Sequence, residues 1–357
     1  MHFAEKLKSY FLRLLTNKKI TAFDIKNARN VLFLRYDRIG DMIITTPVFR
    51  ELKQKYPEIN IAVLASSINQ NVLHNNPYVD KVYLNYKSNL LKDLPTLLKL
   101  RRNKYDVCVE FDHSVIPHAI IRLRIIKPKK VISVFKKGRY GVKGNELKLY
   151  DYYTEKPKGS HFQEIWLNTL SPFEVNSESN QYDLFCSDYQ KKKAKDYLSL
   201  FEKKVLVGIN IEGAVKGKRI QLNNLQEICY GIFNINNNVQ IILLSSPKQR
   251  KKILQFCHNL KLSYVVPSYQ TESILDAAAL IEKLDLVISP DTSIVHLASA
   301  FNKPIISIHE NNKDSYQLFA PTSEINRTVF AQTYEGINDF SVEQLLQYCD
   351  ELMKIIK

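Results

Sequence analysis

Two short loops in the sequence carry side chains whose types and spacing could serve catalysis. The first loop, residues 35–41, has the sequence Arg-Tyr-Asp-Arg-Ile-Gly-Asp. Gly40 permits a tight turn, and Asp41 stands at or near the start of the helix that follows. A carboxylate at that place could accept the proton of an attacking hydroxyl as a general base. It could also do no more than cap the helix, a role that aspartate fills well, so both interpretations stay open.

The second loop, residues 289–300, contains residue types suited to holding an anion. Its sequence is Ser-Pro-Asp-Thr-Ser-Ile-Val-His-Leu-Ala-Ser-Ala. The hydroxyls of Thr292 and Ser293, with the free backbone N–H groups of a first helical turn, predict a site for a diphosphate. His296 follows Thr292 by four residues and shares its helix face. The simpler alternative is that Asp291 caps the helix and His296 is a half-buried helix residue.

Both loops stand between an apolar strand and a helix. Strands and helices alternate along the chain, which predicts parallel sheets covered by helices in an α/β fold. The predicted strands are residues 31–34, 59–64, 81–84, 105–111, 205–209, 239–244, 286–289 and 304–308, and the predicted helices include 43–56, 90–102, 116–126, 222–233 and 248–257. Open sheets of this kind bind ligands at the carboxyl ends of their strands, where both loops fall. The absence of G-x-G-x-x-G argues against a nicotinamide-dependent dehydrogenase.

The chain is long enough for two domains, because 357 residues exceed the usual size of one hydrophobic core. A polar stretch near residues 171–188 predicts the junction between them. Two similar α/β halves predict a ligand cleft between the carboxyl ends of their sheets. The expected parts are an N-terminal helix at 1–28, an N-terminal domain at 29–175, a linker at 176–200, a C-terminal domain at 201–340, and a helix at 341–357 that packs back toward the N-terminal domain.

The composition predicts a basic globular protein. There are 51 Lys and Arg residues against 36 Asp and Glu, a net charge of +15 that attracts nucleic acid, anionic lipid or phosphorylated small molecules. No apolar run reaches the roughly 18 residues that span a bilayer, and a secretory signal is missing, so we expect the protein in the cytoplasm. Single cysteines without metal-ligand or redox spacing suit a reducing compartment. They are Cys108, Cys186, Cys229, Cys257 and Cys349.

The N-terminal segment has the pattern of a basic amphipathic helix. Its apolar residues recur at helical spacing and basic residues fill the other positions. The apolar set is Phe3, Leu7, Tyr10, Phe11, Leu14 and Leu15, and the basic set is Lys6, Lys8, Arg13, Lys18 and Lys19. Such a helix either packs on the domain behind it or lies on an anionic lipid surface, and the sequence leaves both open.

A second basic segment lies in the N-terminal half. Its residues are Arg122, Arg124, Lys127, Lys129, Lys130, Lys136, Lys137, Arg139 and Lys143, which follow Arg101, Arg102 and Lys104. This segment is either a solvated face or a docking surface for a phosphorylated, lipid-linked saccharide and the anionic membrane around it. Nucleic-acid binding is disfavoured, because the segment has no aromatic stacking platform, helix-turn-helix pattern or zinc signature.

The two loops and their surroundings together resemble a known family. Residues 31–57, with Arg-Ile-Gly-Asp, then Thr-Thr-Pro and a helix ending in Lys-Tyr-Pro, are similar to the opening of the lipopolysaccharide heptosyltransferases, glycosyltransferase family 9. The block Asp-Thr-Ser-x-x-His-Leu-Ala at residues 291–298 resembles the family's donor-binding motif. Both motifs occur in order and at the proper separation, and weaker similarity extends over about residues 29–345.

The resemblance implies a GT-B fold, with two Rossmann-like domains facing a central cleft. It implies inverting transfer of heptose from ADP-heptose to a lipopolysaccharide core acceptor on lipid A, with neither metal nor cofactor, at the inner face of the bacterial inner membrane. By position Asp41 matches the general base, and Arg38, Gly40, Arg122 and Arg124 fall on the acceptor side. The matches on the donor side are Lys218, which would contact the phosphates, and Asp291, Thr292, Ser293 and His296.

The sequence departs from the family pattern in the donor half. Family members commonly carry Trp-Pro after the lysine, where this chain has Ile220 and Gln221. They carry Gly-Pro-Thr-Asp-Pro after the strand ending at Ile308, where this chain has His-Glu-Asn-Asn at residues 309–312. A donor pocket of different shape, another sugar donor or another glycan acceptor therefore stays open. An epimerase or an inactive binding homologue is a further alternative, since fold alone does not determine the reaction.

Overall fold

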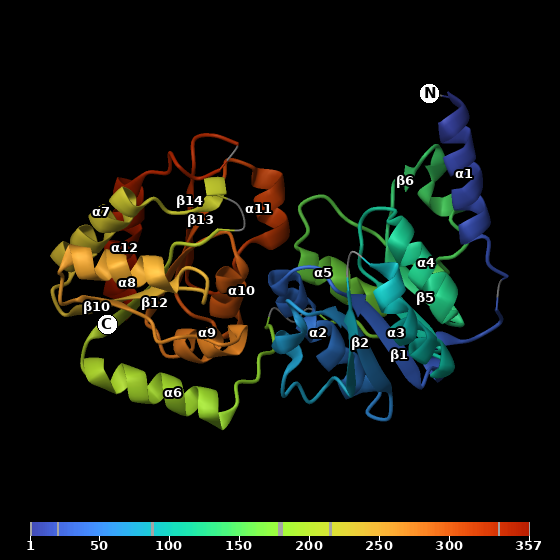
Figure 1. The fold of residues 1–357 in the computed structure, drawn as a ribbon, viewed down its shortest axis with the longest axis horizontal. Helices are drawn as coiled ribbons and strands as arrows, with labels where there is room; N and C mark the ends of the chain where they lie inside the picture. Colours follow the sequence, from blue (N-terminus) through green and yellow to red (C-terminus); the bar gives the residue numbers. More distant parts are fainter. Residues whose placement is uncertain are drawn as a thin grey trace. The chain divides into compact units, whose positions relative to one another are not determined.

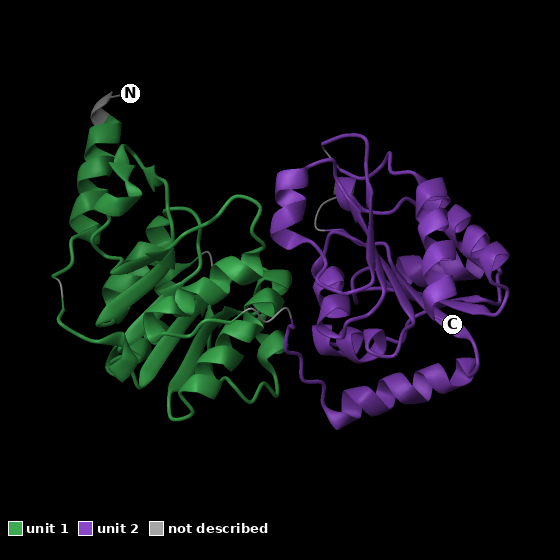
Figure 2. Cartoon of the chain, turned by 180° about the vertical axis from the view of Figure 1, so that it is seen from behind, with its two compact units in different colours: residues 1–179 green, residues 180–357 purple. Residues whose placement is uncertain are grey.

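The chain forms two compact units, residues 1–179 and residues 180–357, in the computed structural model (Figure 2). The structure describes residues 2–19, 21–86, 89–177, 181–213, 216–334 and 336–356. The boundary between the units falls inside the predicted linker at 176–200. The later part of that linker is instead helix α6, Asp188–Leu198, which packs on helix α9, Ile274–Ile281, and so belongs to unit 2.

Unit 1 contains a six-stranded parallel sheet. Its strands, in the order β3-β2-β1-β4-β5-β8, all pair in parallel. They are β1 Asn30–Arg35, β2 Asn60–Ser66, β3 Lys81–Asn85, β4 Val107–Glu110, β5 Lys130–Val134 and β8 Tyr152–Thr154. The direction of strand succession reverses between β1 and β4, and ligands of Rossmann-like sheets bind at this switch point.

Helices cover both faces of this sheet because its strands are apolar on both sides. Leu32, Leu64 and Cys108 on one face pack against α3 and α4, whereas Phe33 on the other packs on Phe49 of α2 at 5.0 Å between ring centroids. The longer elements are α2 Ile39–Lys55, α3 Leu90–Arg102, α4 Pro117–Ile126 and α5 Phe162–Leu167, with the hairpin β6 Gly138–Arg139 and β7 Val142–Lys143 (Figure 1). Short 3₁₀ turns are η1 Ile25–Asn27, η2 Gln70–Leu73, η3 Gly144–Glu146 and η4 Asn168–Phe173.

Helix α1, His2–Thr16, packs on unit 1 by one narrow face and leaves another open. Leu12 and Thr16 are buried against α4 and β7, and Leu15 is partly buried. Leu7, Tyr10, Phe11 and Leu14 are 47–63% exposed and recur at positions i, i+3, i+4 and i+7. The packing interpretation of the N-terminal segment is therefore correct for the side that carries Leu12 and Thr16, and lipid binding by the exposed side stays a prediction. No helix in the described ranges is both long and apolar enough to cross a membrane.

Unit 2 repeats the strand order of unit 1. Its parallel sheet runs β11-β10-β9-β12-β13-β14 and has its switch point between β9 and β12. The strands are β9 Val205–Asn210, β10 Val239–Leu244, β11 Val265–Pro267, β12 Leu286–Pro290, β13 Ile305–His309 and β14 Asn326–Phe330. The other helices are α7 Leu222–Ile235, α8 Arg250–Leu260, α10 Ser293–Ala300, α11 Lys313–Phe319 and α12 Val342–Ile356, with the turns η5 Ser199–Phe201 and η6 Lys216–Lys218.

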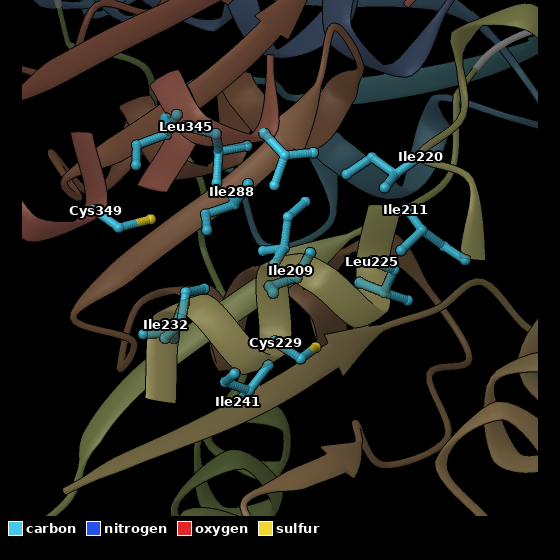
Figure 3. Close-up of a cluster of buried hydrophobic side chains, with 14 of the residues drawn as sticks. Ile209, Ile211, Ile220, Leu225, Cys229, Ile232, Ile241, Ile288, Leu345 and Cys349 are labelled. Carbon is cyan, nitrogen blue, oxygen red and sulfur yellow. The ribbon is translucent and has the colours of Figure 1, made fainter. Parts of the chain in front are cut away.

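The core of unit 2 joins the sheet to α7 and α12. Ile209 and Ile288 from the sheet pack with Leu225 of α7 and Leu345 of α12 (Figure 3). The buried side chains of the C-terminal helix α12 thus pack within unit 2. The expected packing of this helix toward the N-terminal domain stays a prediction, and so does the expected ligand cleft between the two domains. Four cysteines are buried and Cys257 is half-buried, and all five are free thiols, as their spacing predicted.

Candidate active site

The loop after β1 holds Asp41 at the third position of helix α2. The helix begins at Ile39, four residues before the predicted start, so it includes Gly40 and Asp41. The Asp41 carboxylate accepts a hydrogen bond from the backbone N–H of Arg38 at 3.3 Å. The N-cap of the helix is thus Arg38 and not Asp41, which assists the cap from the third helical position. One long hydrogen bond leaves most of the carboxylate's capacity for accepting protons or hydrogen bonds.

Arg35 organises this loop from the end of β1. Its buried guanidinium donates from Nε to the Asp41 carbonyl at 3.2 Å and to Thr45 Oγ1 at 2.8 Å, and from Nη1 to Asp37 Oδ2 at 3.0 Å. It also lies over the ring of Trp166 at 3.6 Å from the centroid. A planar group with several donors can hold the first turn of α2 and the loop together, so Arg35 fixes the position of Asp41.

Burial makes Asp41 a stronger base than an ordinary aspartate. Desolvation raises the pKa of the Asp41 carboxyl, and the negative charge of Asp37 raises it further, against the opposing effect of Arg35. A base is most effective when its pKa lies near the working pH, so this shift favours proton transfer from a sugar hydroxyl. The environment is thus suited to the role that the sequence predicted for Asp41.

A second polar cluster follows strands β4 and β5 on the other side of the switch point. Lys136 is fully buried, pairs with Glu110 Oε2 at 2.7 Å, and donates to the Asp112 carbonyl. Ser133 Oγ donates to Glu110 at 2.7 Å. Burial, and then the neighbouring Glu110 carboxylate, raise the pKa of Asp112 well above its usual range. The cluster therefore combines the buried Lys136–Glu110 ion pair with the Asp112 carboxyl, whose pKa is raised.

His113, the next residue, stays neutral beside this cluster. Burial, and then the charges of Lys156 and Arg35, lower the pKa of His113 to about 3. Its Nε2 accepts a hydrogen bond from Trp166 Nε1 at 3.3 Å, which fixes the indole under Arg35. A neutral imidazole does not repel the Arg35 guanidinium. His113 therefore holds Trp166 against Arg35 without electrostatic cost.

The basic segment of the N-terminal half is partly internal, which corrects the prediction that all of it forms one exposed surface. Arg122 is 1% exposed and pairs with the equally buried Asp93 at 2.7 Å, so its interpretation as an acceptor contact on the surface is wrong. Lys130 and Lys136 are buried as well. Arg124 donates to the Asn17 carbonyl at 3.2 Å and ties α4 to the segment after α1. The exposed members are Lys127, Lys129, Lys137, Arg139 and Lys143.

In unit 2 Asn210, the last residue of β9, connects the two strands at the switch point, β9 and β12. Its side-chain amide donates to Ser289 Oγ at 2.9 Å and to Thr292 Oγ1 at 3.1 Å. Ser289 lies in β12 and Thr292 follows that strand. Thr292 is the N-cap of α10 and accepts from the Ile294 N–H at 3.3 Å, so the cap predicted at Asp291 lies one residue later. The half-buried Ser293 begins the helix. The Thr292 hydroxyl therefore orders the loop, whereas the first-turn N–H groups form the positive end of α10.

Lys218 lies beside Asp291, and its contact with the donor phosphates stays a prediction. Its Nζ is 3.9 Å from Asp291 Oδ2 and 3.0 Å from Glu310 Oε1. The loop that carries it is closed by a hydrogen bond from Ile220 N–H to the Ile211 carbonyl at 3.1 Å. A Cβ atom at Gly213 would collide with the Lys218 carbonyl oxygen, so this close approach requires glycine.

His296 is buried between two aromatic rings rather than half-buried. The centroids of Tyr182 and Phe319 lie 6.2 and 6.3 Å from its ring. Its contact with a donor stays a prediction. In unit 2 the described structure thus brings together Lys218 and Asp291, with Asn210 and Thr292 ordering the same edge of the sheet.

Sequence reasoning missed several residues of these clusters. The sequence patterns do not indicate Glu110, Asp112 or Glu310, and they predict Lys136 as a surface charge. All four lie at or just after the carboxyl end of a parallel strand, a position that could have identified them. Their pairing depends on strand neighbours distant in sequence, which no local pattern reports.

Comparison with known proteins agrees with this architecture. The family model of glycosyltransferase family 9 (heptosyltransferase) matches residues 97–348. Lipopolysaccharide heptosyltransferase 1 of Campylobacter coli is 22% identical over 300 residues, 78% of this chain and 83% of that protein. The glycosyl transferase family 9 structure from Veillonella parvula has a TM-score of 0.75 at 16% identity and covers 94% of this chain and 99% of its own. The structure of E. coli heptosyltransferase WaaC with ADP has a TM-score of 0.70 at 15% identity and covers 91% of this chain and 98% of its own. The α/β fold with two Rossmann-like units of the GT-B kind is thereby confirmed.

Proposed function

The chain belongs to glycosyltransferase family 9, the heptosyltransferases, and on that premise we propose that it transfers heptose from ADP-heptose to a hydroxyl of a lipopolysaccharide core acceptor. The observation that carries the proposal is Asp41, a buried carboxylate of raised pKa at the switch point of unit 1. Lys218 and the first turn of α10, at the corresponding edge of unit 2, supply the positive groups that a diphosphate needs.

In the proposed reaction Asp41 accepts the proton of the acceptor hydroxyl as its oxygen forms a bond to the anomeric carbon. The bond between that carbon and the diphosphate oxygen breaks on the opposite face, so the configuration inverts. Lys218 and the α10 N–H groups stabilise the negative charge that develops on ADP. Diphosphate is already a good leaving group, so the proposal uses neither a second carboxylic acid nor a metal ion or cofactor. Asp291, Ser293 and His296 are proposed to contact the donor, and Arg38 and Gly40 the acceptor.

The acceptor of such a reaction is anchored in a membrane by lipid A. We therefore place the enzyme in the cytoplasm, peripheral to the inner face of the bacterial inner membrane. Support comes from the exposed apolar residues of α1 and the exposed basic residues that follow α4, including Lys137, Arg139 and Lys143. Each basic residue near an anionic bilayer contributes about 1 kcal/mol of attraction.

The donor assignment is tested by calorimetric titration of the purified full chain with ADP and with ADP-heptose, followed by mass spectrometry of a lipopolysaccharide core acceptor after incubation. We expect ADP binding and a gain of one heptose on the acceptor. Transfer of a different sugar, in parallel reactions with other sugar nucleotides, would select the alternative donor. Loss of the same sugar from the core of a deletion strain would identify the acceptor position.

A further inference from the structure

The lysine proposed to bind the donor diphosphate is already paired with two carboxylates. Lys218 Nζ lies 3.0 Å from Glu310 and 3.9 Å from Asp291. The side chains of Lys218, Glu310 and Asp291 are 23%, 17% and 25% exposed, so solvent only partly screens their charges. Glu310 stands in the segment where the sequence departs from the family pattern.

The position of Glu310 is set by the sheet. It directly follows His309, the last residue of β13, whose buried ring packs at 4.9 Å from Tyr316 and 6.3 Å from Phe330. On the other side of this strand, the Asp291 N–H donates to the Ile308 carbonyl at 3.0 Å. The backbone at Asp291 and Glu310 is therefore held by adjacent strands, and the flexible member of the cluster is the long side chain of Lys218.

The charges of the cluster oppose the ligand that Lys218 is expected to bind. One lysine and two carboxylates give a net charge of −1, and a diphosphate adds at least two more negative charges. At separations of about 4 Å in a partly buried site, such repulsion is several times the thermal energy. When Lys218 turns to a diphosphate, the Glu310 carboxylate loses this partner and is left to the little water that reaches it or to other hydrogen-bond donors.

We propose that Glu310 is a displaceable counter-ion of Lys218 and a specificity determinant for the donor, one that weakens binding of free ADP and accepts hydrogen bonds from hydroxyls of the donor sugar. The inference rests on the proposed function. A sugar attached to the diphosphate brings hydroxyl donors to the released carboxylate, whereas ADP alone has none at that end. Glu310 thereby favours the sugar nucleotide over the nucleotide product and assists the release of ADP.

The test measures the dissociation constants of ADP and ADP-heptose for the wild type, Glu310→Gln and Asp314→Asn. Glu310→Gln removes the charge and keeps the shape. Asp314→Asn removes one charge from the exposed first turn of α11, four residues away, and among the described residues Asp314 forms no ion pair with Lys218. We expect Glu310→Gln to bind ADP about tenfold more tightly, since a repulsive charge beside the diphosphate is gone. Affinity for ADP-heptose should change by less, so the preference for the sugar nucleotide falls. Asp314→Asn should match the wild type.

Three outcomes would overturn the inference: unchanged ADP affinity in Glu310→Gln, equal changes for ADP and ADP-heptose, or an equal effect of Asp314→Asn. Glu310→Ala serves as a second variant, with thermal unfolding to verify that each protein is folded. If the wild type binds ADP and these variants behave alike, the inference alone fails. If the wild type binds neither nucleotide, the proposed donor site fails together with it.

Discussion

At the scale of single residues, a substitution of Asp41 can distinguish a catalytic role from a capping role. Asparagine caps helices about as well as aspartate, but it cannot accept a proton. The carbonyl oxygen of an asparagine could still accept the 3.3 Å hydrogen bond from the Arg38 N–H. A substitution at this position therefore leaves the helix terminus intact while removing the base.

For Asp41→Asn we expect turnover to fall by ~10²-fold or more, with the dissociation constant of ADP-heptose nearly unchanged. Stability in urea should stay close to that of the wild type, because the cap is retained. Turnover and donor binding are measured separately, by product mass spectrometry and calorimetry. A fully active variant would remove Asp41 from the mechanism.

Asp37 gives a second, finer test, through the pH dependence of the reaction. The base must be deprotonated, so kcat/KM falls as the pH drops through the pKa of Asp41 in the free enzyme. The negative charge of Asp37 raises that pKa and Arg35 lowers it. Asp37→Asn removes the first effect and leaves the second, so the acidic limb of the profile should move to lower pH. A limb that stays in place or moves upward would contradict this assignment, and Asp314→Asn provides the control for overall charge.

Residue types and spacing indicate some candidate residues and misplace others. Asp41 and Asp291 are predicted from their positions at strand-to-helix turns, whereas Lys218 is predicted only through the resemblance to the family. Arg122 could not be distinguished from a surface arginine, because its burial depends on Asp93, which lies 29 positions earlier and on a different helix. Removing one partner of such a buried ion pair costs roughly 3–5 kcal/mol of folding stability. The role of Arg122 is therefore structural.

At the scale of elements, α1 presents two faces with different physical roles. Leu12 is buried against unit 1, whereas Leu7, Phe11 and Leu14 are exposed near Lys6, Lys8 and Arg13. An exposed apolar stripe flanked by basic residues suits the surface of an anionic bilayer.

The purified protein should therefore float with vesicles containing anionic lipid and be released at high salt, which screens the attraction. Changing Leu7, Phe11 and Leu14 together to Ser should abolish flotation with little effect on unfolding, because these side chains are already exposed. Leu12→Ser is the matched control, since it should lower stability instead. Unchanged flotation of the triple variant would leave α1 with a packing role only.

Periodicity predicted the α/β class and most central strands, but not every element. The eight predicted strands correspond to β1–β4, β9, β10, β12 and β13. The strands β5, β8, β11 and β14 are not predicted, and β8 and β11 have three residues each, too few to show a pattern. The sequence predicts that α2 starts at residue 43, because Gly40 favours a turn, whereas in the structure Gly40 belongs to the helix. Helix α6 was hidden in a polar stretch, because its few buried side chains, such as Ala194 and Leu198, interrupt a charged sequence.

At the scale of the whole molecule, each unit completes its own sheet and buries its own core. Two such cores can lose their order in separate cooperative transitions, so a single melting temperature need not describe the chain. A ligand that binds only the folded form stabilises the unit that holds it, by about 2.7 kcal/mol at a concentration one hundred times its dissociation constant. In scanning calorimetry we therefore expect ADP to raise the transition of residues 180–357 and leave that of residues 1–179 in place. Equal shifts of both transitions would contradict this expectation. They would mean that unfolding of one unit is thermodynamically coupled to unfolding of the other.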